Sequence, residues 1–341
     1  MKAAFLDSLN FFKKLTVQKI FNFLVLLITY YLSKISKKNY FRGLPFAVSI
    51  EPTTSCNLRC PECPSGLRSF TRPTGMLSDA NFKLFISQLK HKLAYLTFYF
   101  QGEPYLNPSF LKQVKYAHEN GIYTMTSTNA HYLDETKAEE TVLSGLDRLI
   151  ISIDGTTQET YESYRVGGDL EKVLKGTRNI IAAKNKFKSS KPYIIFQFLV
   201  VKPNQHQIPE VFKLAKDLGV DKVVLKTAQI YDYQNGSDLI PDIEKYARYK
   251  KNQDGSFEIK NSLSPSCWKM WHSAVITWDG QVVPCCFDKD ASHKLGTISA
   301  QTSFKNIWYG DTYQNFRSKI LHSRSEIDIC KNCTEGTKVF F

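Results

Sequence analysis

Three cysteines in the first fifth of the chain have a spacing that suits a metal cluster. Cys56, Cys60 and Cys63 are separated by three and then two residues. Their soft thiolate sulfurs favour iron–sulfur centres, and three of them can each hold one iron of a four-iron cubane. The fourth iron then has no ligand from the protein, so a small molecule can bind there.

A second group of cysteines lies far from the first, with no cysteine between Cys63 and Cys267. Its members are Cys267, Cys285, Cys286, Cys330 and Cys333. Such grouping indicates ligands rather than structural thiols scattered through a core. A zinc site more often shows paired Cys-x-x-Cys knuckles or a Cys/His mixture, and the first triplet has no fourth ligand nearby. Disulfides require an oxidising compartment, and the chain shows no cleavable export signal. Only Cys330-x-x-Cys333, taken alone, is ambiguous.

Polar residues follow the predicted strands of this chain, where a parallel α/β barrel carries its functional groups. In chain order they are Gly102-Glu103-Pro104, Ser127, Asn129, Ser152, Asp154, Arg165 and Asn204. Glycine and proline also form ordinary turns, and Ser, Asn and Asp also cap helices. Their types alone therefore leave a structural role open.

The elements that would position these residues alternate between β-rich runs and helical stretches over residues 45–230. Such alternation favours a parallel sheet with crossover helices. We predict strands at residues 46–51, 93–101, 123–128, 148–154, 193–201 and 222–226. Six strands fit an α/β fold of the partial (β/α)6 TIM-like barrel type. The chain is long enough to add a second, smaller domain.

The whole chain divides into four segments. Residues 1–44 are predicted as an N-terminal helical segment, residues 45–230 as the barrel, residues 231–262 as a linker and residues 263–341 as a small α+β domain. The linker is rich in turn signals such as Asn235-Gly236. Within the last domain, two β runs around Asp279-Gly280 predict a hairpin that leads directly into Cys285. The basic stretch 184–192 is predicted as an exposed loop.

Together these motifs resemble the radical S-adenosylmethionine (radical SAM) enzymes, and more narrowly those with a C-terminal SPASM or twitch-type auxiliary-cluster domain. The resemblance covers residues 45–341, and the motif around Cys56 is specific. It implies a four-iron cluster held by three cysteines and S-adenosylmethionine. The family cleaves that molecule reductively to a 5′-deoxyadenosyl radical, which abstracts a hydrogen atom from a substrate.

The resemblance also implies which residues hold S-adenosylmethionine. Gly102-Glu103-Pro104 would bind its methionine amino group, with Ser127 in the same set of cofactor-binding residues. Ser152 and Arg165 would bind the methionine carboxylate, to which a forked guanidinium is suited.

The resemblance is less specific about which residues contact the nucleoside part of S-adenosylmethionine. Asn129 and Asp154 are candidates for ribose or substrate contacts, and Asn204 is a further ribose candidate. Glu62 departs from the family pattern, because the residue before the third cysteine is commonly aromatic. Adenine contact would then come from backbone or from apolar groups near the sixth strand.

In the second group, four cysteines resemble the ligands of a single twitch-type cluster: Cys267, Cys285, Cys330 and Cys333. Four thiolates would occupy all its irons, so electron transfer or structural support is the expected role of this auxiliary [4Fe-4S] cluster. Cys286 is the spare, expected to be a small buried apolar residue, although an exchange with Cys285 stays open. Asp288 and His272 are candidate acids or bases only because they lie near these cysteines in the sequence.

The amino terminus combines charge with apolar character. Residues 1–43 hold eight basic residues against Asp7, a net charge of +7 out of +13 for the chain. The apolar run 20–32 would extend only about 20 Å as a helix, short of a hydrocarbon core of about 30 Å. A helix docked on the barrel and one at an anionic membrane surface both remain open. Nucleic-acid binding is not expected, because no base-stacking module accompanies the lysines.

The favoured function is an oxidoreductase, resembling a dehydrogenase, that removes hydrogen from an unidentified small-molecule, envelope or peptide substrate. The auxiliary cluster would transfer electrons, and a flavodoxin or ferredoxin would be the electron donor. A peptide-modifying maturase and a non-catalytic iron–sulfur carrier are the alternatives. Readily oxidised thiolates place the protein in the reducing cytoplasm, with contact at the inner face of the membrane left open.

Overall fold

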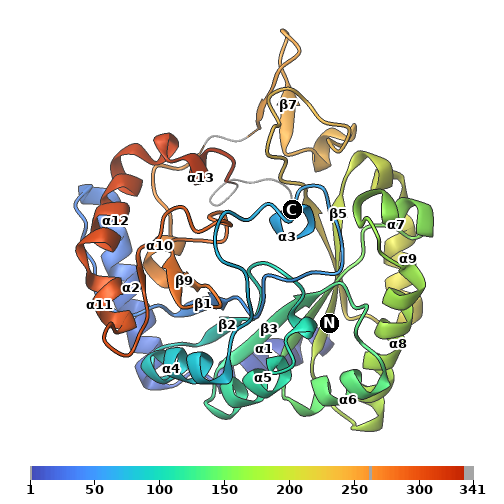
Figure 1. Ribbon diagram of the computed structural model, residues 1–341, viewed down its shortest axis with the longest axis horizontal. Coiled ribbons are helices and arrows are strands. Elements are labelled where there is room, and N and C mark those ends of the chain that lie inside the picture. Colours follow the sequence, from blue (N-terminus) through green and yellow to red (C-terminus); the bar gives the residue numbers. More distant parts are fainter. Residues whose placement is uncertain (1, 261–262, 334–341) are drawn as a thin grey trace.

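The computed structural model describes residues 2–260 and 263–333, which build one nine-stranded sheet surrounded by helices (Figure 1). The strand order is β11-β10-β9-β1-β2-β3-β4-β5-β6, and β7 and β8 form a separate hairpin. The strands are β1 (Ala47–Ile50), β2 (Tyr95–Thr97), β3 (Tyr123–Thr128), β4 (Arg148–Ser152), β5 (Tyr193–Val200), β6 (Lys222–Thr227), β7 (Tyr249–Lys251), β8 (Phe257–Ile259), β9 (Ser273–Ile276), β10 (Gln281–Val283) and β11 (Gly296–Thr297).

Helices connect and cover these strands. They are α1 (Lys2–Lys13), α2 (Val17–Ser36), α3 (Pro64–Leu67), α4 (Asp79–Leu89), α5 (Phe110–Glu119), α6 (Glu135–Leu143), α7 (Gln158–Tyr164), α8 (Leu170–Lys186), α9 (Ile208–Leu218), α10 (Lys269–His272), α11 (Phe304–Tyr309), α12 (Asp311–Ser323) and α13 (Asp328–Lys331).

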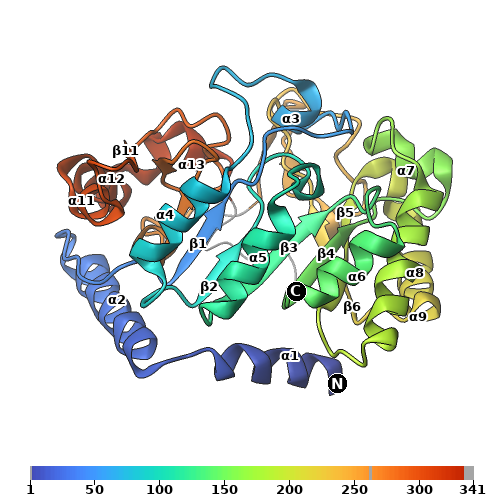
Figure 2. The same ribbon diagram turned by 60° about the horizontal axis from the view of Figure 1, so that its bottom comes forward.

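Strands β1 to β6 pair in chain order, and every pair is parallel. Helices α4, α5, α6, α8 and α9 lie outside this curved sheet (Figures 1 and 2). Strand residues such as Leu96, Ile151 and Phe196 are fully buried in the core between sheet and helices. The predicted α/β partial barrel is therefore confirmed, since parallel strands need crossover helices and a covered face.

Tertiary contacts moved several predicted boundaries. β2 is shorter than the predicted strand 93–101, because the chain after Thr97 leaves the ladder and lines the site described below. Helix α8 continues through Lys186, inside the predicted loop 184–192. Lysines in its last turn suit the negative end of the helix dipole, and Lys184 also pairs with Asp221 at 3.1 Å. The predicted linker 231–262 contains the β7–β8 hairpin.

The C-terminal part continues the sheet of the barrel. β9 pairs in parallel with β1, and β10 pairs antiparallel with both β9 and β11. The β9–β10 turn holds Asp279-Gly280, as the hairpin signal predicted, and β10 leads into Cys285. The division into barrel, linker and C-terminal domain stays a prediction, since one sheet joins the first and last of these.

Two N-terminal helices lie outside the barrel (Figure 2). Helix α1 crosses beneath the amino ends of the strands, where Phe11 packs against the rings of Phe46, Tyr95 and Tyr123. Helix α2 continues to the C-terminal part, and Tyr30 packs there on tryptophans around α10. Among the described residues, α2 alone is long and apolar enough to cross a membrane, and 33% of its most apolar stretch is buried.

Candidate active site

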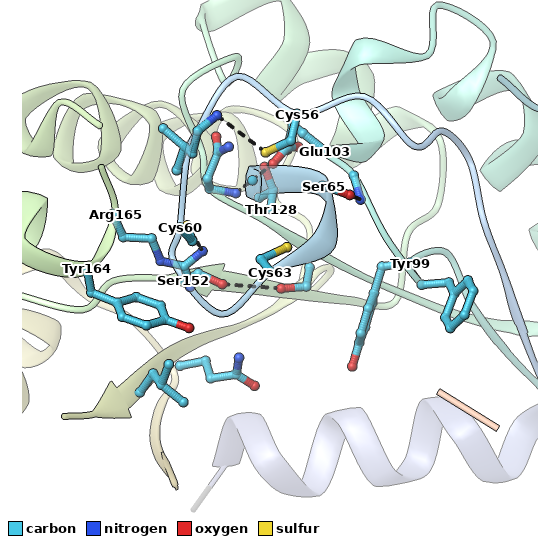
Figure 3. A pocket seen from close by; sticks show the side chains of 18 residues that line it. Cys56, Cys60, Cys63, Ser65, Tyr99, Glu103, Thr128, Ser152, Tyr164 and Arg165 are labelled. Carbon is cyan, nitrogen blue, oxygen red and sulfur yellow. Dashed lines mark hydrogen bonds between the residues drawn. The ribbon is translucent and has the colours of Figure 1, made fainter. Parts of the chain in front are cut away.

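A pocket opens at the carboxyl ends of β1 to β5, where sequence patterns place the chemistry of such barrels. Figure 3 shows the thiols of Cys56 and Cys63 directed toward it, with polar groups from neighbouring strands. Its lining consists of Cys56, Leu58, Cys60, Cys63, Ser65, Gly66, Tyr99, Phe100, Gly102, Glu103, Ser127, Thr128, Asn129, Ser152, Tyr164, Arg165, Gln197 and Leu199. The structure thus brings the first three cysteines together with six of the predicted cofactor-binding residues.

The cysteine loop is fixed by its own backbone and by α3. Cys63 precedes α3, and Pro64 starts this helix with the backbone angle that a first turn requires. Gly66 packs against the backbone of Cys60, where a Cβ would approach within 2.6 Å of its nitrogen and oxygen. The loop therefore holds three thiols at one side of the pocket.

The thiols suit a multi-iron cluster. Among the residues that the structure describes, no three Cys, His, Asp or Glu side chains converge as ligands of a single ion would. In a cubane each thiolate binds a different iron, so its sulfurs need not converge on one point. Burial raises the pKa of the Cys56 thiol to about 11 and also raises that of Cys60. Iron binding would thus release protons from these thiols.

Glu103 is buried beside the loop that precedes Cys56. Its carboxylate accepts hydrogen bonds from Thr128 Oγ1 at 2.7 Å and from the backbone nitrogen of Asn129 at 2.8 Å. Burial nevertheless raises the pKa of Glu103 to about 7, because a low-dielectric site disfavours the charged form. A cationic ligand in the pocket would favour the ionised carboxylate, which fits the amino group that the family resemblance implies for this residue.

Gly102 allows this arrangement. Its φ of +75° lies in the left-handed region, and a Cβ would come within 2.2 Å of the Thr53 carbonyl oxygen. The next backbone nitrogen, that of Glu103, donates to Ser55 O at 2.8 Å. The Gly102–Glu103 segment is therefore pressed against the cysteine loop. Pro104, the third residue of the motif, is buried and starts a 3-10 helix without lining the pocket.

Polar groups from β3 and β4 complete one wall. The hydroxyl oxygens of Ser127 and Ser152 lie 3.4 Å apart. Asn129 donates through Nδ2 to Asn57 Oδ1 at 2.8 Å, which links the end of β3 to the cysteine loop. These contacts leave hydroxyl and amide groups facing the pocket, where they can bind a polar ligand.

Arg165 is oriented by Asp154. Its Nε donates to Asp154 Oδ2 at 2.5 Å, and its Nη1 lies 3.8 Å from Cys60 Sγ. Asp154 is fully buried, and its Oδ1 accepts from the Leu199 backbone nitrogen at 2.7 Å. Asp154 therefore contacts the protein beneath Arg165 and does not line the pocket, whereas Arg165 does.

Asn204 has a similar internal position. It is fully buried, accepts from the backbone nitrogen of Val201 and donates to the carbonyl oxygens of Asp154 and Leu199. Every one of these partners is backbone, so Asn204 closes the turn after β5 rather than facing the pocket. Glu62 accepts from the Tyr231 backbone nitrogen at 3.0 Å, which ties the cysteine loop to the segment after β6.

A second, apolar cavity lies in the C-terminal part. All four predicted auxiliary ligands line it: Cys267, Cys285, Cys330 and Cys333. Phe287, Phe316 and Ile320 form part of its wall. Arg324 Nη2 lies 3.7 Å from Cys333 Sγ, a cation that suits anionic sulfur. Four thiols around this apolar cavity fit a cluster whose irons all have protein ligands.

Cys286 lies outside this cavity. Its expected role as a buried apolar residue is wrong, because the thiol is exposed. It follows Cys285 directly in the chain, but only Cys285 lines the cavity.

Asp288 and His272 also line neither cysteine pocket. Asp288 accepts from the backbone nitrogens of Ser292 and His293, which makes it the centre of a loop. His272 precedes β9 at the amino ends of the strands and stacks on Trp268 at 4.6 Å. Since β9 runs parallel to β1, this places His272 at the end of the sheet opposite the cysteine loop.

Sequence reasoning missed several lining residues, chiefly Tyr99, Tyr164, Gln197 and Leu199. One signal was present in β5. Gln197 and Leu199 alternate with the fully buried Phe196 and Phe198, so they face the opposite side of the sheet. A glutamine inside an apolar strand could have indicated a polar pocket.

Two families match the sequence. Residues 50–215 match the radical SAM superfamily, and residues 267–334 match an iron–sulfur cluster-binding domain, SPASM. The two matches together cover more than half of the chain and contain the two cysteine groups.

Curated relatives agree with these matches. The chain is 30% identical over 201 residues to the PqqA peptide cyclase of Gluconobacter oxydans (strain 621H), over 58% of this chain and 54% of that protein. It thus spans about half the length of that relative. It is 27% identical over 304 residues to the tungsten-containing aldehyde ferredoxin oxidoreductase cofactor-modifying protein of Pyrococcus furiosus, over 79% of this chain and 82% of that protein.

A solved structure shares the fold. SuiB of Streptococcus suis, bound to S-adenosylmethionine, superposes with a TM-score of 0.63 at 14% identity, over 90% of this chain and 75% of that one. At this identity the likeness shows the fold alone.

Proposed function

Because the chain belongs to the radical SAM superfamily and carries a SPASM domain, we propose that it abstracts a hydrogen atom from an organic substrate held in the pocket beside Cys56, Cys60 and Cys63. Cys56, Cys60 and Cys63 would hold a four-iron cluster there, which together with S-adenosylmethionine would supply the 5′-deoxyadenosyl radical for this step. The observation that carries the proposal is one pocket lined by three thiols, Glu103 and Arg165.

The chain's own groups would bind and orient the cofactor. The Glu103 carboxylate would accept the methionine amino group, and the Arg165 guanidinium would face the methionine carboxylate, oriented from below by Asp154. Ser127 and Ser152 would add hydroxyl contacts. Apolar and aromatic groups that line the same pocket, among them Phe100, Tyr164 and Leu199, would limit the access of water to the reacting atoms.

The outcome proposed for the substrate is oxidation. The cavity in the C-terminal part would hold the auxiliary cluster, whose four thiolates leave no open iron. Such a cluster would accept one electron from the substrate radical while a proton leaves to solvent, so that the substrate loses two hydrogens in all, as in a dehydrogenase. A flavodoxin or ferredoxin is the proposed reductant for the first cluster.

The first test is cleavage of S-adenosylmethionine. Protein reconstituted anaerobically with iron and sulfide should form 5′-deoxyadenosine when dithionite is added. Cys60→Ala should abolish this, since a cubane with two protein thiolates is poorly held. Cys286→Ala, which changes a cysteine outside both cavities, is the matched control. Full cleavage by Cys60→Ala would refute the cluster assignment.

A peptide substrate is the second candidate, favoured by the 30% identity to a peptide cyclase. Anaerobic enzyme would be incubated with the peptide and small-molecule fractions of a cell extract, and both would be followed by mass spectrometry. Loss of two hydrogens from a peptide supports this candidate. The same loss confined to the small-molecule fraction rejects it.

A further inference from the structure

Helix α1 is attached to the barrel by polar side chains beside the aromatic contacts of Phe11. Asn10 Nδ2 donates to Asp147 Oδ1 at 2.7 Å, and Lys14 forms an ion pair with the same buried carboxylate. The carboxylate of Asp7 accepts a hydrogen bond from the Tyr123 hydroxyl and forms an ion pair with Arg148. These partners lie at the amino ends of β3 and β4, so α1 closes the end of the barrel opposite the cysteine pocket (Figure 2).

The attachment of α2 is polar as well. Lys19 is buried and donates to Gly121 O at 2.7 Å. Asn22 bonds Leu44 twice, through Nδ2 to its oxygen at 2.7 Å and through Oδ1 from its nitrogen at 3.0 Å. Tyr30 OH lies 3.1 Å from Ser266 Oγ. A surface helix normally turns its apolar side inward, and much of the inward side of α2 is polar instead.

The outward sides of both helices are apolar. Large side chains recur there every three or four residues, and all are exposed: Phe5 (68%), Leu9 (38%), Phe12 (63%), Val17 (83%), Phe21 (64%), Leu24 (47%), Ile28 (59%), Tyr31 (51%) and Ile35 (80%). We call these residues the outer apolar face. Large exposed apolar side chains gathered on two consecutive helices mark a contact with something other than water.

Positive charge accompanies the outer apolar face. Lys13 is the last residue of α1, and Lys34, Lys37, Lys38 and Arg42 lie in the last turn of α2 or after it; all five are exposed. Asp7 is the sole acidic residue in the sequence 1–43, and it is buried against Arg148. Two copies of this chain joined through this face would place like charges side by side without acidic partners. An anionic lipid surface offers both the apolar layer and the opposite charge.

A membrane span does not suit the same helix. Its 20 residues pass the length and composition test, but crossing would take Lys19 and Asn22 from their barrel partners into hydrocarbon. Buried charge in a bilayer is costly, whereas a helix lying in the interface keeps these bonds.

We propose that α1 and α2 form a membrane-docking surface that seats the protein on an anionic bilayer. The outer apolar face enters the interface between headgroups and acyl chains, and the five exposed cations contact lipid phosphates. Because α1 covers the amino ends of the strands and α2 continues from it beside the C-terminal part, the cysteine pocket at the carboxyl ends opens away from the lipid.

The test is flotation of the full-length holoprotein with lipid vesicles. Vesicles of mixed phosphatidylglycerol and phosphatidylcholine should carry the protein, and pure phosphatidylcholine vesicles should carry less. The triple variant F21S/I28S/I35S should bind at least about tenfold more weakly, because three exposed apolar anchors are lost. The matched control L143S/F212S changes exposed apolar residues on α6 and α9 and should bind as the native chain does. Cleavage of S-adenosylmethionine should be unchanged in both, so docking is tested separately from catalysis.

Charge and topology give further readouts. The variant K34Q/K37Q/K38Q and high salt should each weaken flotation, and alkaline carbonate should release the bound protein. Failure of the native chain to float, or equal flotation of the triple variant, would overturn the proposal. Resistance to carbonate would show a span instead. A native dimer by light scattering that F21S/I28S/I35S converts to a monomer, without lipid binding, would make the face a subunit contact.

Discussion

Among single residues, Glu103 ties a measurable pH dependence to ligand binding. Burial raises its pKa to about 7 in the ligand-free protein, and a cationic amino group binds the ionised form. The ionised fraction rises about tenfold between pH 6 and pH 8 for a group with this pKa. We expect the affinity for S-adenosylmethionine to rise over that range by less than this factor, because an α-amino group with a pKa of about 7.7–8.0 begins to lose its proton there. Calorimetric titration of the reconstituted enzyme measures this rise.

The control for this prediction removes the titrating group. Glu103→Gln should lose the pH dependence and bind about tenfold or more weakly at pH 8, since hydrogen bonds to charged groups contribute about 1.5–3 kcal/mol. Glu119→Gln changes an exposed acid on α5 and should behave as the native enzyme. An unaltered pH profile in Glu103→Gln would assign the titration to another group.

The sequence located the residues of the pocket only in part. Cysteine spacing and the Gly-Glu-Pro motif placed the thiols and Glu103 at one end of the barrel, because both follow parallel strands. Asp154 and Asn204 obey the same rule, yet their side chains turn inward to bind Arg165 and backbone. Which way a polar side chain turns after a strand depends on partners distant in sequence, and no local pattern encodes them.

At the scale of elements, the loop after β2 is shaped by Gly102. Gly102→Ala would adopt a left-handed conformation, which costs about 1–2 kcal/mol, and would also press its Cβ on Thr53 O. Gly219, at the end of α9, has a similar φ of +80° but no atom within 4 Å of the added Cβ. We expect Gly102→Ala to lower the free energy of unfolding by at least about 2 kcal/mol more than Gly219→Ala does.

Denaturant unfolding measures that difference, and iron content after reconstitution gives a second readout. Because Thr53 and Ser55 lead into Cys56, a displaced loop should also bind less iron. Equal losses of stability in the two variants would mean that the cysteine loop moves away from the added Cβ at no cost in free energy. The close contact would then be unimportant for stability.

Helices and strands with a regular pattern of apolar residues were predictable from the sequence, but the residues at which they end were not. The strand predicted at 123–128 matches β3, because alternation and flanking glycine bound it locally. β2 ends early because Tyr99 and Phe100 face the pocket. The apolar run 20–32 predicted a helix whose turns extend to Val17 and Ser36, stabilised by a Thr16 side-chain cap and by polar contacts with the barrel.

For the whole molecule, the second cysteine group should be separable from the first in function. The double variant C330A/C333A removes two thiols from the apolar cavity but leaves the barrel pocket intact. We expect iron to fall from about eight to about four per chain. Cleavage of S-adenosylmethionine should persist while substrate oxidation is lost, as measured by product analysis. Loss of cleavage in a folded variant would contradict this division.

The two halves should not be separable as folding units, because β9 pairs with β1 along four residues of each strand. Truncation after residue 260 would expose that edge of the sheet and would remove the fully buried Trp271 and Trp308. The free-energy cost of an exposed sheet edge and of the lost apolar packing exceeds the free energy of unfolding, which is about 5–15 kcal/mol for most domains. We therefore expect the fragment 1–260 to be insoluble or unfolded by circular dichroism, while C330A/C333A, which lacks the auxiliary ligands but keeps β9, stays folded. A fragment 1–260 that melts within a few degrees of the full chain would show that the barrel is complete without β9.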